Sequence, residues 1–153
     1  MAQKNFYSSE TYAVGKSVAA LMKQGVQAFH RTVDEKVADL GLTSLQWGPL
    51  VLLANGKAST AAQLSRCHNV DTSTMTRMLD RLENKKLITR QRNASDRRVV
   101  DIELTEEGHR LAQKIPHIIT ESLNQHLRGF SREEFDLFQT LLRRFAEGER
   151  KGD

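Results

Sequence analysis

Apolar residues recur every three or four positions along most of the chain, a spacing that predicts amphipathic helices. Helices are expected at residues 10–40, 43–54, 60–67 and 71–85, and two more begin after Thr105 and Ser131. Between the fourth and the fifth, residues 87–92 and 99–104 have the character of two short strands joined by a loop. The pattern predicts a mainly α fold with one small β-hairpin, of the α+β class.

Residues that begin, end or break helices refine these bounds. Capping boxes, in which a Ser or Thr precedes Gln or Glu by three positions, begin helices at Thr43, Thr60 and Ser131. Gly41 is a typical helix stop. Pro49 falls inside the second helix and predicts a kink or a late start there, while Pro116 predicts a bend in the fifth.

The fourth helix divides into two faces when it is placed on a helical wheel. Its apolar side consists of Met75, Met78, Leu79 and Leu82. The opposite side carries small hydroxyl residues and arginines, with no bulky apolar group. A short capped helix, a turn, a second helix of this kind and an arginine-rich hairpin follow one another in the order of a winged helix-turn-helix.

In such a module the second helix enters the DNA major groove. Arg77 can then pair with a guanine edge, and Arg81 flanks the same face. Contacts to phosphates or bases are also expected from Ser73, Thr74 and Thr76. Asp80 on this face would repel phosphate, so it lies past the contact zone or braces an arginine.

The hairpin brings four arginines close to its tip: Arg90, Arg92, Arg97 and Arg98. Asp96 can hydrogen-bond a nearby guanidinium and hold it extended, which suits insertion into a narrow minor groove. The alternative is a solvated turn in which Asp96 only caps the loop.

The charge distribution supports contact with DNA. The whole chain has a net charge of +4, while residues 60–100 alone hold nine lysines and arginines against four acidic residues. The excess positive charge therefore lies in the expected helix-turn-helix and hairpin, where it would attract the phosphate backbone.

Several other classes are disfavoured. We find no nucleophile–base pair, phosphate loop or metal motif, so neither catalytic residues nor a metal or cofactor is expected. No apolar run approaches the length of a membrane span, and no signal peptide is recognised. The single cysteine, Cys67, fits a reducing cytoplasm and is expected to be a buried, inert thiol, with a redox switch as the alternative.

Residues 42–108 closely resemble the MarR family of bacterial transcriptional regulators. The matching motifs are Leu42-Thr43, Gln46-Trp47, Gln63-Leu64, Thr74-Met75-Thr76-Arg77, Asp96-Arg97-Arg98 and Leu104-Thr105-Glu106-Glu107-Gly108. The resemblance implies a homodimer that binds a near-palindromic operator and usually represses, with Asp96 bracing the wing and Arg98 in the minor groove. One departure is Lys85-Lys86, where the family often has a glycine, and this argues against a left-handed helix cap.

The resemblance also implies a division of one domain, residues 1–153, into a DNA-binding lobe at 43–105 and dimerisation helices at 10–40 and 106–150. The apolar stripes of those helices have no obvious partner within so small a chain, which favours a homodimer. Redox-responsive or ligand-independent control, and a protein–protein winged-helix module, are the alternative functions.

Many family members bind a small aromatic carboxylate or phenol between the dimerisation helices and the DNA-binding lobe. The candidate wall for this effector consists of Phe29, His30, Arg31, Ser44, Trp47 and Gly48. Trp47 offers a stacking surface, and His30 or Arg31 could meet a carboxylate. For Trp47 the alternative is ordinary core packing.

Overall fold

The computed structural model describes residues 5–148. Its elements are α1 (Val18–Val37), a 3-10 turn η1 (Ala38–Leu40), α2 (Ser44–Ala54), α3 (Ala61–His68), α4 (Thr72–Asn84), β1 (Ile88–Arg92), β2 (Val100–Leu104), α5 (Glu106–Ala112), α6 (Ile115–His126) and α7 (Arg132–Glu147). The mainly helical fold with one antiparallel hairpin is confirmed. Residues 149–150, the end of the expected dimerisation segment, lie outside the described residues.

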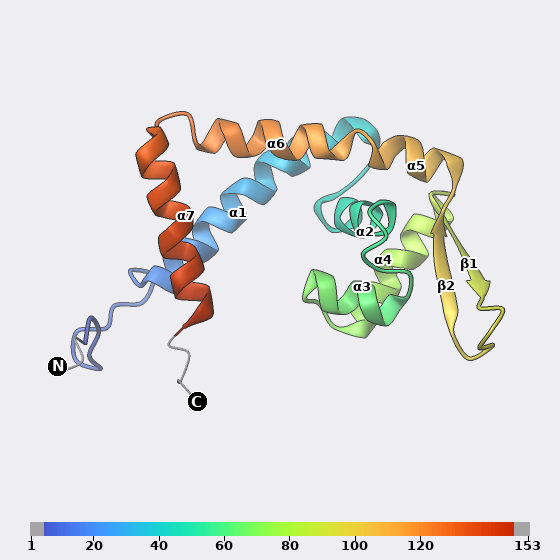
Figure 1. The fold of residues 1–153 in the computed structure, drawn as a ribbon, viewed down its shortest axis with the longest axis horizontal. Helices are drawn as coiled ribbons and strands as arrows, with labels where there is room; N and C mark the ends of the chain where they lie inside the picture. Colours follow the sequence, from blue (N-terminus) through green and yellow to red (C-terminus); the bar gives the residue numbers. More distant parts are fainter. Residues whose placement is uncertain (1–4, 149–153) are drawn as a thin grey trace.

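The elements form a long arm with a lobe beneath one end (Figure 1). Helices α1 and α6 pack along each other in the arm. The lobe contains α2, α3, α4 and the β1–β2 hairpin, and α5 joins the hairpin to the arm. Helix α7 lies at the opposite end of the molecule from the hairpin.

Helix α1 begins later than its apolar pattern predicted. Ser17 caps it by accepting a hydrogen bond from the backbone of Ala20, so the helix starts at Val18 rather than near residue 10. Gly15 precedes the cap in a left-handed conformation, with φ of 85°, which a helix cannot contain. Gly41 ends the segment with φ of 69°, as expected.

The two prolines have different consequences. Helix α2 starts at Ser44, directly after the Thr43–Gln46 capping box, and runs through Pro49, so a late start is wrong. Pro116 lies in the first turn of a separate helix, α6, rather than in the middle of a bent one. In that position its missing N–H needs no helical partner, and the break falls before it, at Gln113 and Lys114.

The core lies where the lobe meets the arm. It buries Leu50 of α2, Leu64 of α3 and the apolar face of α4, while Ile88 and Ile102 from the hairpin close it on one side. The arm contributes Val33, Val37 and Ile115, and α5 contributes Leu111 and Ala112. Helix α7 adds no buried residue.

Polar contacts tie the lobe together at its edges. Lys85, just after α4, donates from Nζ to the carbonyl of Gly41 at 2.5 Å and to Oε1 of buried Gln46 at 2.8 Å. The backbone of Ile102 donates to the carbonyl of Ser59 at 2.7 Å, which attaches the α2–α3 connection to the edge of β2. Helix α4 is therefore anchored to the beginning of α2 as well as to the core.

None of the described helices is, by itself, both long and apolar enough to cross a bilayer. Residues 18–40 and 45–54 reach that criterion only as a pair, with a bend of 78° between them.

Lys86 adopts a left-handed backbone conformation, with φ of 57°. The sequence Lys85-Lys86, without a glycine, had predicted that no left-handed helix cap forms here, so that prediction is wrong. Its carbonyl accepts from the hydroxyl of Thr105 at 2.7 Å, which holds the chain in this turn. For a residue with a Cβ, this conformation costs roughly 1–2 kcal/mol. Tertiary contacts therefore impose a strained cap on a residue that does not favour it.

Replacing Lys86 with glycine should relieve this strain. We expect Lys86→Gly to raise the free energy of unfolding by about 1 kcal/mol, measured by urea denaturation at a fixed protein concentration. Lys114→Gly is the matched control, because Lys114 has φ of −83° and carries no such strain. An unchanged or lowered stability for Lys86→Gly would show that the cap is not strained.

Candidate nucleic-acid interface

Helix α4 presents the two faces that its sequence pattern predicted. Met75, Met78, Leu79 and Leu82 are at most 3% exposed. Ser73, Thr76, Arg77 and Arg81 are exposed on the other side, while Thr74 is half-buried. Neither Arg77 nor Arg81 forms an ion pair with any residue that the structure describes. Both guanidinium groups are therefore available to an external acceptor.

The hydroxyl groups of this helix are engaged near its beginning. Asp71 caps α4 by accepting from the backbone of Thr74 at 2.8 Å. Its carboxylate also accepts from the Ser73 hydroxyl at 2.5 Å and from the Thr74 hydroxyl at 2.6 Å. These hydrogen bonds, the Ser73 one foremost, hold the pKa of Asp71 well below its usual value, so it is ionised at neutral pH.

Arg90 differs from the other arginines that were expected to contact DNA. Its guanidinium donates to Asp80 at 2.8 Å and to Glu83 at 2.6 Å, and its side chain is only 26% exposed. Arg90 therefore ties β1 to the outer side of α4. Asp80 was expected either to lie past the DNA-contact zone or to brace an arginine. The structure shows the second arrangement, with Arg90 as the arginine.

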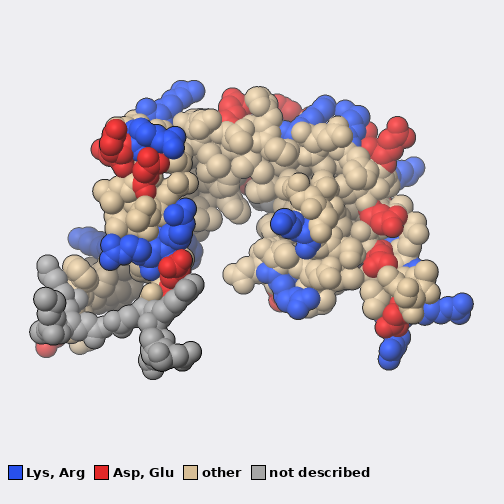
Figure 2. Space-filling view, viewed as in Figure 1, with Lys and Arg blue, Asp and Glu red and all other residues tan. Residues whose placement is uncertain are grey.

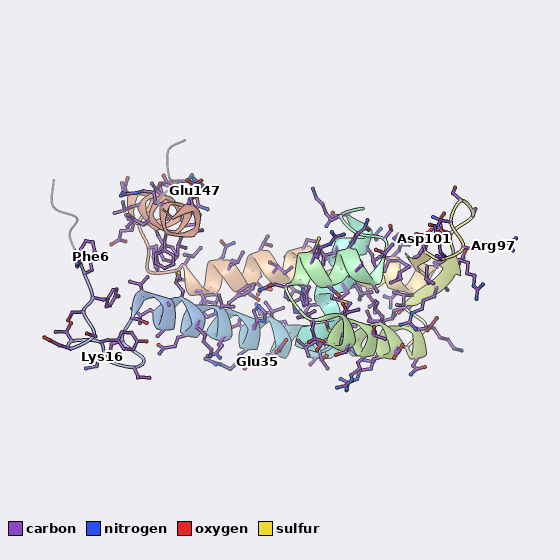
Figure 3. The ribbon with its side chains drawn as sticks, turned by 90° about the horizontal axis from the view of Figure 1, so that it is seen from below. Phe6, Lys16, Glu35, Arg97, Asp101 and Glu147 are labelled. Carbon is purple, nitrogen blue, oxygen red and sulfur yellow. The ribbon has the colours of Figure 1, made fainter. Side chains whose placement is uncertain are left out.

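The wing is the antiparallel β1–β2 hairpin, paired from Ile88–Leu104 to Arg92–Val100. At its tip, Oδ1 of Asp96 accepts from the backbone and from Nε of Arg98, at 3.0 and 3.2 Å. The Arg98 side chain remains 92% exposed. Arg92 and Arg97 are exposed too, and Figure 3 shows Arg97 at the extreme end of the hairpin.

Asn93 also shapes the wing tip, a role that sequence reasoning missed. Its side-chain oxygen accepts from the backbone of Ser95 and of Asp96, and its amide donates to Asp101 at 2.6 Å. Asparagine at the first position of a loop is a common turn former, which was the available signal. The turn directs the tip arginines outward, where Figure 2 shows Lys and Arg side chains projecting at the end of the lobe.

The expected effector wall is partly assembled between α1, α2 and α3. The rings of Phe29 and His30 lie 5.8 Å apart, and those of His30 and Trp47 lie 6.2 Å apart, both edge to face. Nε1 of Trp47 is buried without a hydrogen-bond partner among the described residues. Arg31, the residue that follows His30, is exposed. The side chain of Ser44 is not among those that the structure describes.

His68 of α3 belongs to the same cluster, although sequence reasoning did not assign it there. A Cβ added to Gly48 would lie 2.3 Å from Cε1 of His68, so glycine lets the imidazole pack against α2. Burial lowers the pKa of His68, and the nearby His30 lowers it further. Contact between residues 48 and 68 depends on the packing of two helices, so no local signal could have revealed it.

Other candidate chemistry is limited. Cys67 is exposed on α3, so the expectation of a buried thiol is wrong. No group of three or more potential metal ligands occurs among residues 5–148. An open groove of about 450 Å³ lies between α2, α3, β2 and α5, lined in part by Lys57 and His109, and it includes none of the effector-wall residues.

Comparisons with known proteins match both this site and the fold. The model of the MarR family matches residues 42–100. The reduced form of MarR from E. coli is 24% identical, with 84% of this chain and 96% of that chain covered and a TM-score of 0.76. The S. aureus MepR–DNA complex is 23% identical, with 86% and 97% covered and a TM-score of 0.77.

A third match is to Bordetella bronchiseptica BpsR, whose structure concerns regulation of DNA binding by 6-hydroxynicotinic acid. It is 22% identical, with 90% of this chain and 99% of that chain covered and a TM-score of 0.77. At these identities the solved structures show the fold alone, and the family model adds a match to residues 42–100.

The lowered pKa of His68 makes stability depend on pH. The unfolded chain takes up this proton near pH 6.5, whereas the folded protein resists it. Stability is therefore full well above that pH and falls as the pH drops through about 6.5 toward the lower pKa of the folded state. We expect His68→Gln to flatten this slope in denaturant titrations, and His109→Gln on α5 to leave it in place. An equal slope in wild type and His68→Gln would contradict the assignment.

Proposed function

We propose that this chain is a homodimeric repressor of the MarR family, whose model matches residues 42–100. In this proposal it binds a near-palindromic operator and releases it when a small aromatic carboxylate or phenol binds. The observation that carries the proposal is the exposed polar face of α4, with unpaired Arg77 and Arg81, beside a wing whose tip arginines point away from the core.

This arrangement suits both grooves of DNA. An arginine on an outward-facing helix can donate two hydrogen bonds to a guanine in the major groove. Arg97 and Arg98 at the wing tip could enter the minor groove, whose narrow form attracts guanidinium groups. Asp96 restrains Arg98 without covering it, which limits the entropy lost on binding.

Homodimer formation is supported by an apolar stripe that one chain leaves exposed. On α7, Phe138, Leu141 and Phe145 are 45%, 49% and 54% exposed. Figure 3 shows α7 standing apart from α1, so neither helix covers the other. Leu21 near the start of α1 is also 58% exposed. Burying such a stripe against a second copy would remove the cost of leaving it in water.

The effector proposal rests on the Trp47 cluster. A buried indole N–H without an acceptor is destabilising, and a carboxylate or phenolate oxygen would satisfy it. His30, edge-on to Trp47, could donate to the same oxygen while the indole stacks on the aromatic ring. The cluster also joins α1 of the arm to α2 and α3 of the lobe, so a ligand there could change how the lobe is held.

DNA binding can be tested after a site has been selected from random duplexes. By fluorescence anisotropy, we expect Arg77→Ala to lower affinity by roughly 5- to 150-fold and to relax one base position. Arg98→Ala should lower affinity and reduce the salt slope by about 1. Sedimentation should still give two chains for both, because neither residue lies on α1, α6 or α7.

Arg143→Ala on α7 is the matched control and should bind as the wild type does. If Arg77→Ala and Arg98→Ala both bound like wild type across a salt titration, the groove assignment would be wrong. If the wild type bound no duplex in a salt-dependent way, the protein–protein module would replace the repressor.

Trp47 is the single tryptophan, so its fluorescence reports directly on the effector site. Titration with benzoate, phenol or 6-hydroxynicotinic acid should change this fluorescence saturably and displace DNA. His30→Ala should weaken that response about tenfold, whereas His117→Ala, an exposed histidine on α6, should not. A flat response to every probe would favour ligand-independent control, or redox control through exposed Cys67.

A further inference from the structure

Three hydroxyl groups on α4 face partners that can only accept, which fixes the direction of their hydrogen atoms. The Ser73 and Thr74 hydroxyls face the carboxylate of Asp71, at 2.5 and 2.6 Å. The Thr76 hydroxyl faces the backbone carbonyl of Thr72, at 2.8 Å. A carboxylate and a carbonyl can only accept, so each hydroxyl must be the donor. Every one of these three protons is therefore used inside the helix.

What remains for an incoming ligand is the lone pairs on the oxygens. A hydroxyl has one hydrogen to donate and two lone pairs that accept. Ser73 and Thr76 are exposed and three residues apart, so their side chains are neighbours on the outer face of α4. Arg77 follows on the same face and can only donate. The face thus combines acceptors from two hydroxyls with donors from one guanidinium.

This pattern selects among the groups that DNA exposes. Phosphate oxygens, guanine O6 and N7, and thymine O4 are acceptors, which cannot pair with a hydroxyl that has no free hydrogen. The amino groups of adenine and cytosine are the donors of the major groove. To donate to a phosphate instead, Ser73 would have to give up a charge-assisted bond to Asp71.

We propose that Asp71 is a specificity-determining positioning residue, which makes Ser73 an acceptor that selects adenine or cytosine in the operator. Thr76 selects an amino base in the same way, through its bond to Thr72, and Arg77 selects guanine. The proposal rests on the proposed function, because it concerns the same face of α4. Asp71 acts through Ser73 and need not touch DNA itself.

The test compares sequences selected from random duplexes by wild type and by variants. Ser73→Ala and Thr76→Ala identify the base positions that each hydroxyl contacts, as the positions where preference is lost. In the wild type these positions should hold adenine or cytosine on the strand that faces the helix. Replacing such an adenine with purine, which removes only the amino group, should lower affinity about fivefold.

Comparing Asp71→Gly with Asp71→Asn separates readout from charge. Glycine is a good N-cap residue but removes the acceptor of the Ser73 proton, which becomes free. In Asp71→Asn the side-chain oxygen that accepts from the backbone of Thr74 can also keep the Ser73 bond, while the amide group faces the Thr74 hydroxyl. The preference at the Ser73 position should therefore shift toward guanine or thymine in Asp71→Gly and stay unchanged in Asp71→Asn. The Thr76 position should not change, because its proton goes to Thr72. Asp136→Asn, on α7, removes the same charge far from this face and should shift neither.

The results of these measurements either support or overturn the role proposed for Asp71. A uniform rise in affinity for Asp71→Gly with unchanged base preference would mean that Asp71 acts only as a charge, and would overturn the proposal. Guanine or thymine at the wild-type positions, no position lost in Ser73→Ala, or no effect of the purine probe would overturn it too. The purine measurement uses the wild type and does not depend on a variant that folds. If the wild type enriched no sequence, the proposed function itself would fail.

Discussion

Burial of one face of α4 is the interaction on which the rest of the lobe depends. Its four apolar side chains fill the space between α2, α3 and the hairpin, and each contributes roughly 1.5–3 kcal/mol by leaving water. Because they occupy one side of a helix, the other side must face outward. The same packing that stabilises the lobe therefore exposes Ser73, Thr76 and Arg77, as the proposed contact with DNA requires.

Polar contacts hold α4 at three places around this core. Asp71 caps its beginning, Arg90 joins its outer side to β1, and Lys85 ties its end to Gly41 and Gln46. Each contact uses a charge that would otherwise be solvated. In the case of Arg90 this withdraws one arginine from those expected to contact DNA and neutralises Asp80, which would have repelled phosphate. Asp71, Asp80 and Glu83 are thus structural partners within the lobe.

Features that depend on nearby residues could be predicted from the sequence. The faces of α4, the caps at Thr43 and Ser131, and the contact between Asp96 and Arg98 all involve separations of at most four positions. Predictions that required distant contacts were less accurate. Cys67 was expected to be buried, and Arg90 was grouped with free arginines, because their surroundings come from other elements.

The sequence by itself determined the order of the helices, the position of the hairpin and the amphipathic division of α4, since these follow from backbone preferences and helical periodicity. Only the tertiary structure decided which charges are paired between different elements. It placed His68 against Gly48, forced Lys86 into a left-handed cap, and bound Arg90 to two carboxylates. The physical reason is that these states are set by neighbours brought together through packing, which a local pattern does not specify.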